Sequence, residues 1–240
     1  MAEAHIVLRL VECAYLFRQE PTLPYSPVPP SLDGGRPAIS APLAAGCRVL
    51  LLYAHPQPQA SRVNRKLAEA ARAVPGVVVS DLYETYPDFY IEVARERALV
   101  SRAEVLVLVF PLQWYACPAL LKEWFDVVLH DAWQVDRVKP TESGARRRCQ
   151  VVLSTGGAAA DFAAGRRHGR QLADYLAPLA QSARVCGMDW LEPLVLYNAH
   201  GVDNAAVEAH VARFTATLEA LAGAAPMLGD ATVKGDDHGN

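Results

Sequence analysis

The sequence predicts an α/β fold, a doubly wound parallel five-stranded sheet in a single domain. Short apolar runs alternate with amphipathic stretches at helical spacing, which is the pattern of repeated strand–helix–strand units. The apolar runs show no inward–outward alternation, as expected of parallel strands that are covered on both faces. With 240 residues, 52% of them hydrophobic and 20% charged, the chain has the size and composition of one globular domain.

Five segments are predicted to be strands. The first, Val49–Tyr53, is a continuous run of apolar residues. Four further runs follow it along the chain: Val77–Leu82, Val105–Phe110, Gln150–Leu153 and Leu191–Leu196. Right-handed crossovers through the intervening helices make all five strands parallel.

A helix is predicted after each strand. Ser61 is a candidate N-cap, and Pro75-Gly76 ends the helix that it begins. Pro118 opens another helix, at a position where the missing N–H of proline costs nothing. The remaining helices are expected at about Ile91–Arg102, Leu172–Ala183 and Val207–Leu221, with a polar, aromatic loop over Tyr83–Tyr90.

The flanking segments are predicted to lie outside this domain. Pro21–Pro42 holds seven prolines and a glycine pair, so residues 1–46 are interpreted as an N-terminal extension with a Pro-rich linker. Before the linker, Ile6, Leu10 and Phe17 stand at roughly helical spacing, which suits either a loosely packed appendage or a docking helix. The domain is expected over residues 47–225, followed by a flexible tail at 226–240.

Composition excludes several classes of function. A formal net charge of −3 and a pI near 6.2 do not show the basic character expected of a nucleic-acid-binding protein. No apolar run is long enough to span a membrane, and charged residues interrupt the first residues where a signal peptide would be apolar. The five cysteines are odd in number, scattered and without a Cys-x-x-Cys pair. We therefore expect a cytoplasmic protein without disulfides or a zinc site.

Three loops with ligand-binding character follow the first, third and fourth predicted strands. They are His55-Pro56 with Ser61–Asn64, then Pro111–Tyr115, then Ser154–Gly157. In the flavodoxin-like strand order 2-1-3-4-5 these strands are neighbours, and ligands bind outside the carboxyl ends of such strands. Because an ordinary turn needs no matching partners on adjacent strands, the three loops together predict one binding site.

The first loop suits a phosphate group. It leads into a helix N-terminus, where unpaired backbone N–H groups and the helix dipole favour an anion. His55 and the Ser61 hydroxyl add donors, and Asn64 is placed to reach a ribityl hydroxyl. The alternative is that Ser61 only caps its helix and that His55 is a surface residue.

The second and third loops suit a flat ring system. The backbone N–H groups of Gln113 and Trp114 are expected to bond the pyrimidine edge of an isoalloxazine, beside an apolar aromatic wall. Gly156-Gly157 lets the backbone approach the flavin N1/O2 side, where negative charge develops on reduction. The alternatives are that Trp114-Tyr115 belongs to a core or interface and that the glycine pair is a turn. Taken with the phosphate loop, these loops predict a flavin site.

These motifs resemble those of the NAD(P)H:quinone oxidoreductase family, in particular the KefF- and KefG-type ancillary proteins of glutathione-regulated potassium-efflux systems. The similar stretches are His55-Pro56 with Ser61 and Asn64, Leu82–Phe89, Phe110–Tyr115, Pro118–Trp124, Thr155–Gly157 and Cys186–Pro193. The resemblance spans roughly Cys47–Leu221. It implies a flavodoxin-like homodimer that binds FMN, takes hydride from NAD(P)H and passes two electrons to a quinone.

By position, the resemblance assigns the cofactor contacts. They are His55, Ser61, Arg62, Val63, Asn64, Leu112, Gln113, Trp114, Tyr115, Ser154, Thr155, Gly156 and Gly157. FMN is the expected cofactor, with FAD as the alternative and NAD(P)H as the co-substrate. Because the flavin carries the chemistry, no catalytic residue and no metal ligand is predicted.

Two functions stay open at this point. The first is an enzyme, a flavin-dependent NAD(P)H dehydrogenase (quinone). The second is a regulatory ancillary subunit of a potassium/proton antiporter with little catalytic role, peripheral on the cytoplasmic face of the inner membrane. An electron-carrier flavodoxin is disfavoured, because carriers of that kind tend to be strongly acidic and this chain is near neutral.

Other residues near the motifs receive structural interpretations. His168 is interpreted as a solvated loop residue, with a catalytic, charge-balancing role beside the reduced flavin as the alternative. Phe162 lacks the hydroxyl that the mammalian quinone reductases, by the same resemblance, have after the glycine pair. The runs Arg146–Arg148 and Arg166-Arg167 are interpreted as solvated charges, with a dinucleotide phosphate as the alternative. Cys117 and Cys186 are interpreted as small buried hydrophobic residues.

Overall fold

The protein is described by a computed structural model for residues 48–129 and 146–223. The predicted extension at 1–46 and the predicted tail at 226–240 lie outside the described residues, so the predicted domain limits stay predictions. No helix in the described part of the chain is long and apolar enough to cross a membrane.

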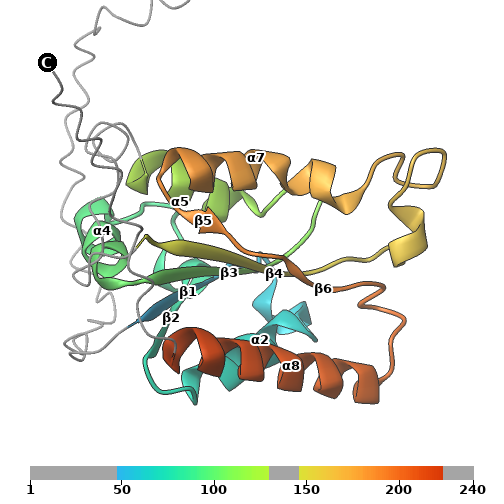
Figure 1. Cartoon of the computed structure of the whole chain (residues 1–240), viewed down its shortest axis with the longest axis horizontal. Coiled ribbons are helices and arrows are strands. Elements are labelled where there is room, and N and C mark those ends of the chain that lie inside the picture. Colours follow the sequence, from blue (N-terminus) through green and yellow to red (C-terminus); the bar gives the residue numbers. More distant parts are fainter. Residues whose placement is uncertain (1–47, 130–145, 224–240) are drawn as a thin grey trace, which may run out of the picture. The chain divides into compact units, whose positions relative to one another are not determined.

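The strands form a parallel sheet in the order β2-β1-β3-β4-β5, as predicted (Figure 1). The four longer strands are β1 (Val49–Tyr53), β2 (Val77–Asp81), β3 (Val105–Pro111) and β4 (Arg148–Ser154). The register pairs Tyr53 with Val109 and Pro111 with Ser154. The carboxyl ends of β1, β3 and β4 therefore meet at one edge of the sheet, which is where the three predicted loops begin.

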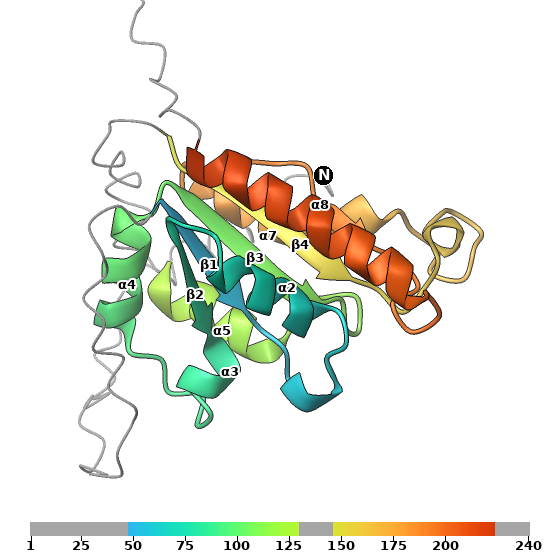
Figure 2. The same ribbon diagram turned by 90° about the horizontal axis from the view of Figure 1, so that it is seen from below.

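Helices cover both faces of the sheet (Figures 1 and 2). The layer on one face consists of α4 (Val93–Arg102), α5 (Ala119–Val128) and α7 (Leu172–Val185). The other face carries α2 (Asn64–Arg72) and α8 (Asn204–Gly223). Along β1, Leu50 and Leu52 pack in the first layer, whereas Val49 and Leu51 pack in the second. This two-sided burial explains why the strand runs are apolar throughout.

The predicted fifth strand, Leu191–Leu196, is wrong in its bounds. The structure has two short strands, β5 (Asp189–Trp190) and β6 (Leu194–Leu196), and each pairs with β4. Pro193 has no N–H for the ladder, which interrupts the pairing between them. The Gln150 side chain donates to the Glu192 carbonyl at 2.5 Å and so satisfies the interrupted backbone.

The predicted loop over Tyr83–Tyr90 begins instead with a short helix, α3 (Leu82–Thr85). The Asp81 side chain accepts the Glu84 N–H at 3.2 Å and caps this helix. The helix therefore takes Leu82 from the end of the predicted second strand.

Candidate functional site

The first loop enters α2 two residues later than predicted. A 3₁₀ turn, η1 (Pro58–Ala60), precedes it, and Val63 is the N-cap residue. The predicted N-cap, Ser61, still serves the helix, because its Oγ accepts the Arg65 N–H at 3.0 Å. Val63 is 4% exposed and packs in the core, so its side chain is turned away from a ligand.

One buried polar atom in this loop region has no hydrogen-bond partner among the described residues. Asn64, the first residue of α2, is 1% exposed and its Oδ1 is unpaired. The buried hydroxyl of Tyr53, at the carboxyl end of β1, is instead close to the Ser61 side chain, and burial raises its pKa. Leaving a buried polar atom unpaired costs about 1–3 kcal/mol. Asn64 therefore points to a polar ligand at the start of α2.

His55 and Arg62 have different side-chain partners. The Gln57 N–H donates to His55 Nδ1 at 3.1 Å, which leaves Nε2 as the N–H donor of the neutral ring. Burial lowers the His55 pKa and favours this neutral form. Arg62 donates to the Val202 carbonyl at 2.8 Å and to Asn204 Oδ1 at 2.9 Å. The Arg62 side chain thus ties the first loop to the start of α8.

The second loop is a tight turn with strained backbone. Gln113 and Ala116 exchange two backbone hydrogen bonds, at 3.1 and 3.0 Å, and the turn between them is left-handed. Trp114 has φ 49° and Tyr115 has φ 65°. Non-glycine residues in this region cost of order 1–3 kcal/mol each and concentrate at functional sites. Trp114 is nevertheless 94% exposed, so the turn presents a bare indole to solvent.

This turn changes one predicted contact. The Gln113 N–H, expected to bond a ring edge, is already paired with the Ala116 carbonyl. The Trp114 N–H donates to no backbone carbonyl among the described residues. Leu112 is held to the third loop, because its N–H donates to the Ser154 carbonyl at 2.9 Å. The second loop therefore offers one of its two expected backbone donors.

The two glycines of the third loop have different surroundings. A Cβ on Gly157 would lie 2.3 Å from His168 Nε2, so only glycine fits there without displacing that ring. A Cβ on Gly156 would meet nothing closer than His200 Cδ2 at 3.7 Å, and Gly156 is exposed. Thr155 Oγ1 donates to the Gly157 carbonyl at 2.8 Å and rigidifies the loop. Open space therefore lies over Gly156, beside a fixed backbone.

His168 is packed in the site, and its interpretation as a solvated loop residue is wrong. Its ring stacks on Phe162 with centroids 4.3 Å apart, and Nδ1 lies 3.4 Å from the Tyr115 hydroxyl. The Tyr175 hydroxyl donates to the His168 carbonyl. Nε2 is buried and unpaired among the described residues, and it faces Gly157. The Phe162 ring stacks on His168 and so helps to hold it beside the glycine pair.

A fourth segment at this edge, the turn Asn198–Gly201 that follows β6, is not among the predicted loops. The Asn198 N–H donates to the Gly157 carbonyl and the Ala199 N–H to the Thr155 carbonyl, both at 2.8 Å. Asn198 has φ 52°, a conformation that asparagine tolerates better than most residues. Its position just after the last strand of the sheet was the available sequence signal.

The arginine run at Arg146–Arg148 lies at the opposite end of β4 and does not reach the site. Arg147 is 4% exposed and donates to the carbonyls of Ala103 and Ser101, each at 2.8 Å, at the end of α4. Arg146 pairs with Asp189 at 3.1 Å. The dinucleotide-phosphate alternative is therefore wrong for this run, and Arg147 is a buried helix cap rather than a solvated charge.

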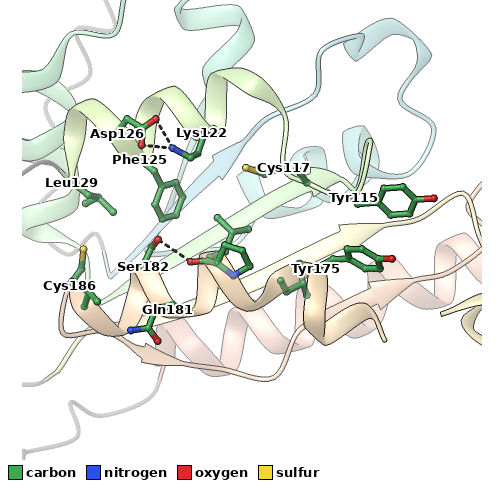
Figure 3. A pocket seen from close by; sticks show the side chains of 15 residues that line it. Tyr115, Cys117, Lys122, Phe125, Asp126, Leu129, Tyr175, Gln181, Ser182 and Cys186 are labelled. Carbon is green, nitrogen blue, oxygen red and sulfur yellow. Dashed lines mark hydrogen bonds and ion pairs between the residues drawn. The ribbon is translucent and has the colours of Figure 1, made fainter. Parts of the chain in front are cut away.

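A groove of about 560 Å³ runs from the second loop between α5 and α7 (Figure 3). Tyr115 and Tyr175 stack at one end of it, with ring centroids 4.9 Å apart, and Cys186 lies at the other end. Cys117 also lines it, and burial raises the pKa of both thiols. Cys186 is buried as interpreted, whereas Cys117 is only partly buried.

Strand order, the convergence of three loops at one sheet edge and the unpaired polar atoms there define a doubly wound α/β protein with a strand-end ligand site. The chain belongs to the family described by the flavodoxin-like fold, which matches residues 47–218. The fold class and the family resemblance predicted from the motifs are thus confirmed.

The chain is similar in sequence to two potassium-efflux ancillary proteins. The chain is 42% identical over 150 residues to KefG of Cronobacter sakazakii, an alignment that covers 62% of this chain and 80% of the relative. It is 33% identical over 170 residues to KefF of an Enterobacter species, covering 71% of this chain and 94% of the relative. Both are named glutathione-regulated potassium-efflux system ancillary proteins.

Two solved structures share the fold. General stress protein 14 of Treponema denticola, solved in complex with FMN, is 31% identical with a TM-score of 0.64, covering 72% of this chain and 99% of that one. An NADPH-quinone reductase of P. pentosaceus has a TM-score of 0.62 at 22% identity, covering 71% and 97%, and shows the fold alone.

Proposed function

We propose that this chain is an FMN-dependent NAD(P)H:quinone oxidoreductase that transfers two electrons as hydride. The observation that carries the proposal is the unpaired Asn64 Oδ1, buried at the N-terminus of α2, at the sheet edge where the glycine-containing third loop also lies. FMN has a phosphate for the N-terminus of α2 and ribityl hydroxyls that can donate to Asn64. The FMN complex of the Treponema relative supports the same cofactor.

The residues present fit FMN at both ends. His55 Nε2 and the backbone N–H groups at the start of α2 are donors for a phosphate. The space over Gly156 is free of side-chain atoms within 3.7 Å of a Cβ position, which leaves room for a ring against the backbone. FAD remains the alternative, because these contacts involve only the part that the two cofactors share.

Bound FMN would supply the hydride chemistry, accepting hydride from NAD(P)H and passing it to a quinone. The chain's own groups hold and enclose it. The exposed rings of Trp114 and Tyr115 would form an aromatic wall against bound FMN and exclude water there. His168 holds an imidazole nitrogen beside Gly157. From there it would stabilise the negative charge that develops on the flavin during reduction, without reacting itself. NAD(P)H and the quinone would use the solvent-facing side in turn.

The test is to purify the full chain and identify any released chromophore. We expect a yellow protein that releases FMN on heating and oxidises NADH or NADPH when a quinone is supplied. A protein that stays colourless after incubation with FMN and with FAD would overturn the flavin assignment. A yellow protein without quinone-dependent turnover would overturn the enzymatic one.

A second candidate function is the regulation of a potassium/proton antiporter from the cytoplasmic face of the inner membrane. It is favoured by the names of the relatives at 42% and 33% identity. Co-expression with an antiporter of the Kef type, followed by potassium efflux measurements, separates the two candidates. Flux that depends on the chain in the absence of quinone turnover would favour the regulator.

We propose a homodimer that buries the groove between α5 and α7. Val185, 52% exposed, and Phe125 give the groove an apolar lining. Lys122 and Asp126 on its rim are about half exposed and pair at 2.6 Å within α5. A two-fold dimer packed on this face would bring a second copy of the same charge pair opposite the first, and such a surface can be self-complementary. Sedimentation of Lys122→Glu, expected to favour monomer, against the charge-swapped Lys122→Glu/Asp126→Lys, expected to dimerise, tests this interface.

A further inference from the structure

The turn Asn198–Gly201 is fixed from two sides of the site. Its backbone is bonded to the third loop through Asn198 and Ala199, both at 2.8 Å. Just after the turn, the Val202 carbonyl and Asn204 Oδ1 accept hydrogen bonds from Arg62 of the first loop. The turn thus bridges the loop assigned to the phosphate and the loop assigned to the ring.

The turn also has a built conformation. Gly201 closes it, because a Cβ there would lie 2.6 Å from Asn198 Nδ2. The N–H groups of Gly201 and Val202 both donate to the Asn198 carbonyl, at 2.8 and 3.1 Å. The left-handed asparagine and the two N–H groups bonded to its carbonyl fix the backbone on both sides of His200.

The turn holds His200 beside Gly156. The nearest atom to a Cβ built on Gly156 is His200 Cδ2, at 3.7 Å. Cδ2 is bonded directly to Nε2, so the ring edge that faces Gly156 carries a nitrogen. His200 is exposed, whereas His168 faces Gly157 with a buried Nε2. An imidazole ring therefore lies beside each glycine of the pair, His200 beside Gly156 and His168 beside Gly157.

We propose that His200 is a flavin-contacting residue outside the sequence motifs. It donates an imidazole N–H to the pyrimidine side of the ring that lies over Gly156 and binds the reduced, electron-rich ring more tightly than the oxidised one. The inference rests on the proposed function, since it places the flavin over Gly156. Its physical basis is that a fixed donor is most stabilising where negative charge develops.

The experiment compares His200→Leu and His200→Gln in the full chain loaded with FMN. Fluorescence titration measures the affinity for oxidised FMN, and equilibration with a reference dye measures the two-electron potential. We expect His200→Leu to bind reduced flavin about tenfold more weakly while oxidised affinity stays within a few-fold, which lowers a two-electron potential by about 30 mV. His200→Gln keeps an N–H donor and recovers most of this shift.

Two controls separate the possible failures. Glu219→Gln, an exposed change near the far end of α8, is expected to leave the potential and affinity at the wild-type values. If both His200 variants keep the wild-type potential, His200 does not stabilise the reduced flavin and the proposal is overturned. If both variants lose affinity for oxidised FMN and thermal stability alike, His200 acts only on the structure of the turn, and the proposal is also overturned. A wild-type chain that binds no flavin would overturn the proposed function together with this inference.

Discussion

The two ends of the parallel sheet satisfy their polar groups in opposite ways. At the amino end, Arg48 pairs with Glu104 at 2.6 Å, and Arg147 donates to two carbonyls at the end of α4. At the carboxyl end, Asn64 and His168 each hold a buried polar atom without a partner among the described residues. The amino-end arginines in this part of the chain are thus paired within the protein, whereas these carboxyl-end atoms are not.

Backbone strain follows the same division. The non-glycine residues with left-handed φ in the described chain are Phe89, Trp114, Tyr115 and Asn198. All of them lie in segments that follow carboxyl ends of strands. Strain and unpaired polar atoms both cost stability, so their coincidence at one edge indicates a site shaped for something other than stability. Substitutions at the two ends should therefore affect different measurements.

The largest effect is expected at Gly156. Gly156→Val should weaken FMN binding by about a hundredfold or more while the fold is retained, because the added side chain enters the space over the backbone and its Cβ meets no protein atom closer than 3.7 Å. Gly157→Val is the matched comparison, since its Cβ would lie 2.3 Å from His168 Nε2 and should also lower the melting temperature. Stoichiometric FMN in Gly156→Val would show that the ring does not lie there.

A pH effect is expected away from both ends, at His210 in α8. Burial and the Arg213 charge lower the His210 pKa from 6.5 to about 4. The folded state therefore holds the neutral ring, and stability is lost as the pH falls from about 6.5 to 4. We expect a loss of about 2–3 kcal/mol by pH 4. Denaturant unfolding should show a shallower pH dependence in His210→Leu, and an identical one would contradict this assignment.

At the amino end, Arg147→Met should lower the free energy of unfolding by about 1–3 kcal/mol, because the Ala103 and Ser101 carbonyls lose their donor. FMN affinity should stay near the wild-type value, since Arg147 lies at the other end of β4. Chemical denaturation and fluorescence titration of the same variant test both parts. A loss of FMN affinity without a loss of stability would contradict this assignment, because it would mean that Arg147 acts on ligand binding and not on stability.

Ser61→Ala should have a smaller effect on binding than Gly156→Val. The helix N–H groups remain available to a phosphate, so we expect FMN to bind about tenfold more weakly. Stability should fall by about 1 kcal/mol, because the Arg65 N–H loses its side-chain acceptor. Unchanged affinity with reduced stability would mean that Ser61 only caps its helix.

The smallest effect is expected from deleting residues 1–45. Flavin content, quinone reduction and dimer mass should stay nearly unchanged, because β1 begins only at Val49. Any loss should appear instead in association with a partner or a membrane surface. A truncated chain that loses flavin or its dimer would show that the extension packs against the domain.

The sequence by itself determined the four longer strands, most of the helices and the three loops. These depend on local patterns: an apolar run such as Val105–Pro111 is buried on both faces wherever it lies in a parallel sheet. The residues after such a strand must emerge at its carboxyl edge. The loops at Ser61, Trp114 and Gly156 were therefore predictable without coordinates.

Only the tertiary structure decided how these loops are completed. His168 joins the site because Phe162 and Tyr115 pack against its ring, and His200 joins it because Asn198 bonds to Gly157. The tertiary structure also buries Arg147, which donates to the carbonyls of Ala103 and Ser101 at the end of α4. Such contacts join residues far apart in the chain, so no local periodicity or spacing encodes them. They follow from which side chains the assembled sheet and helices bring within hydrogen-bonding or stacking distance.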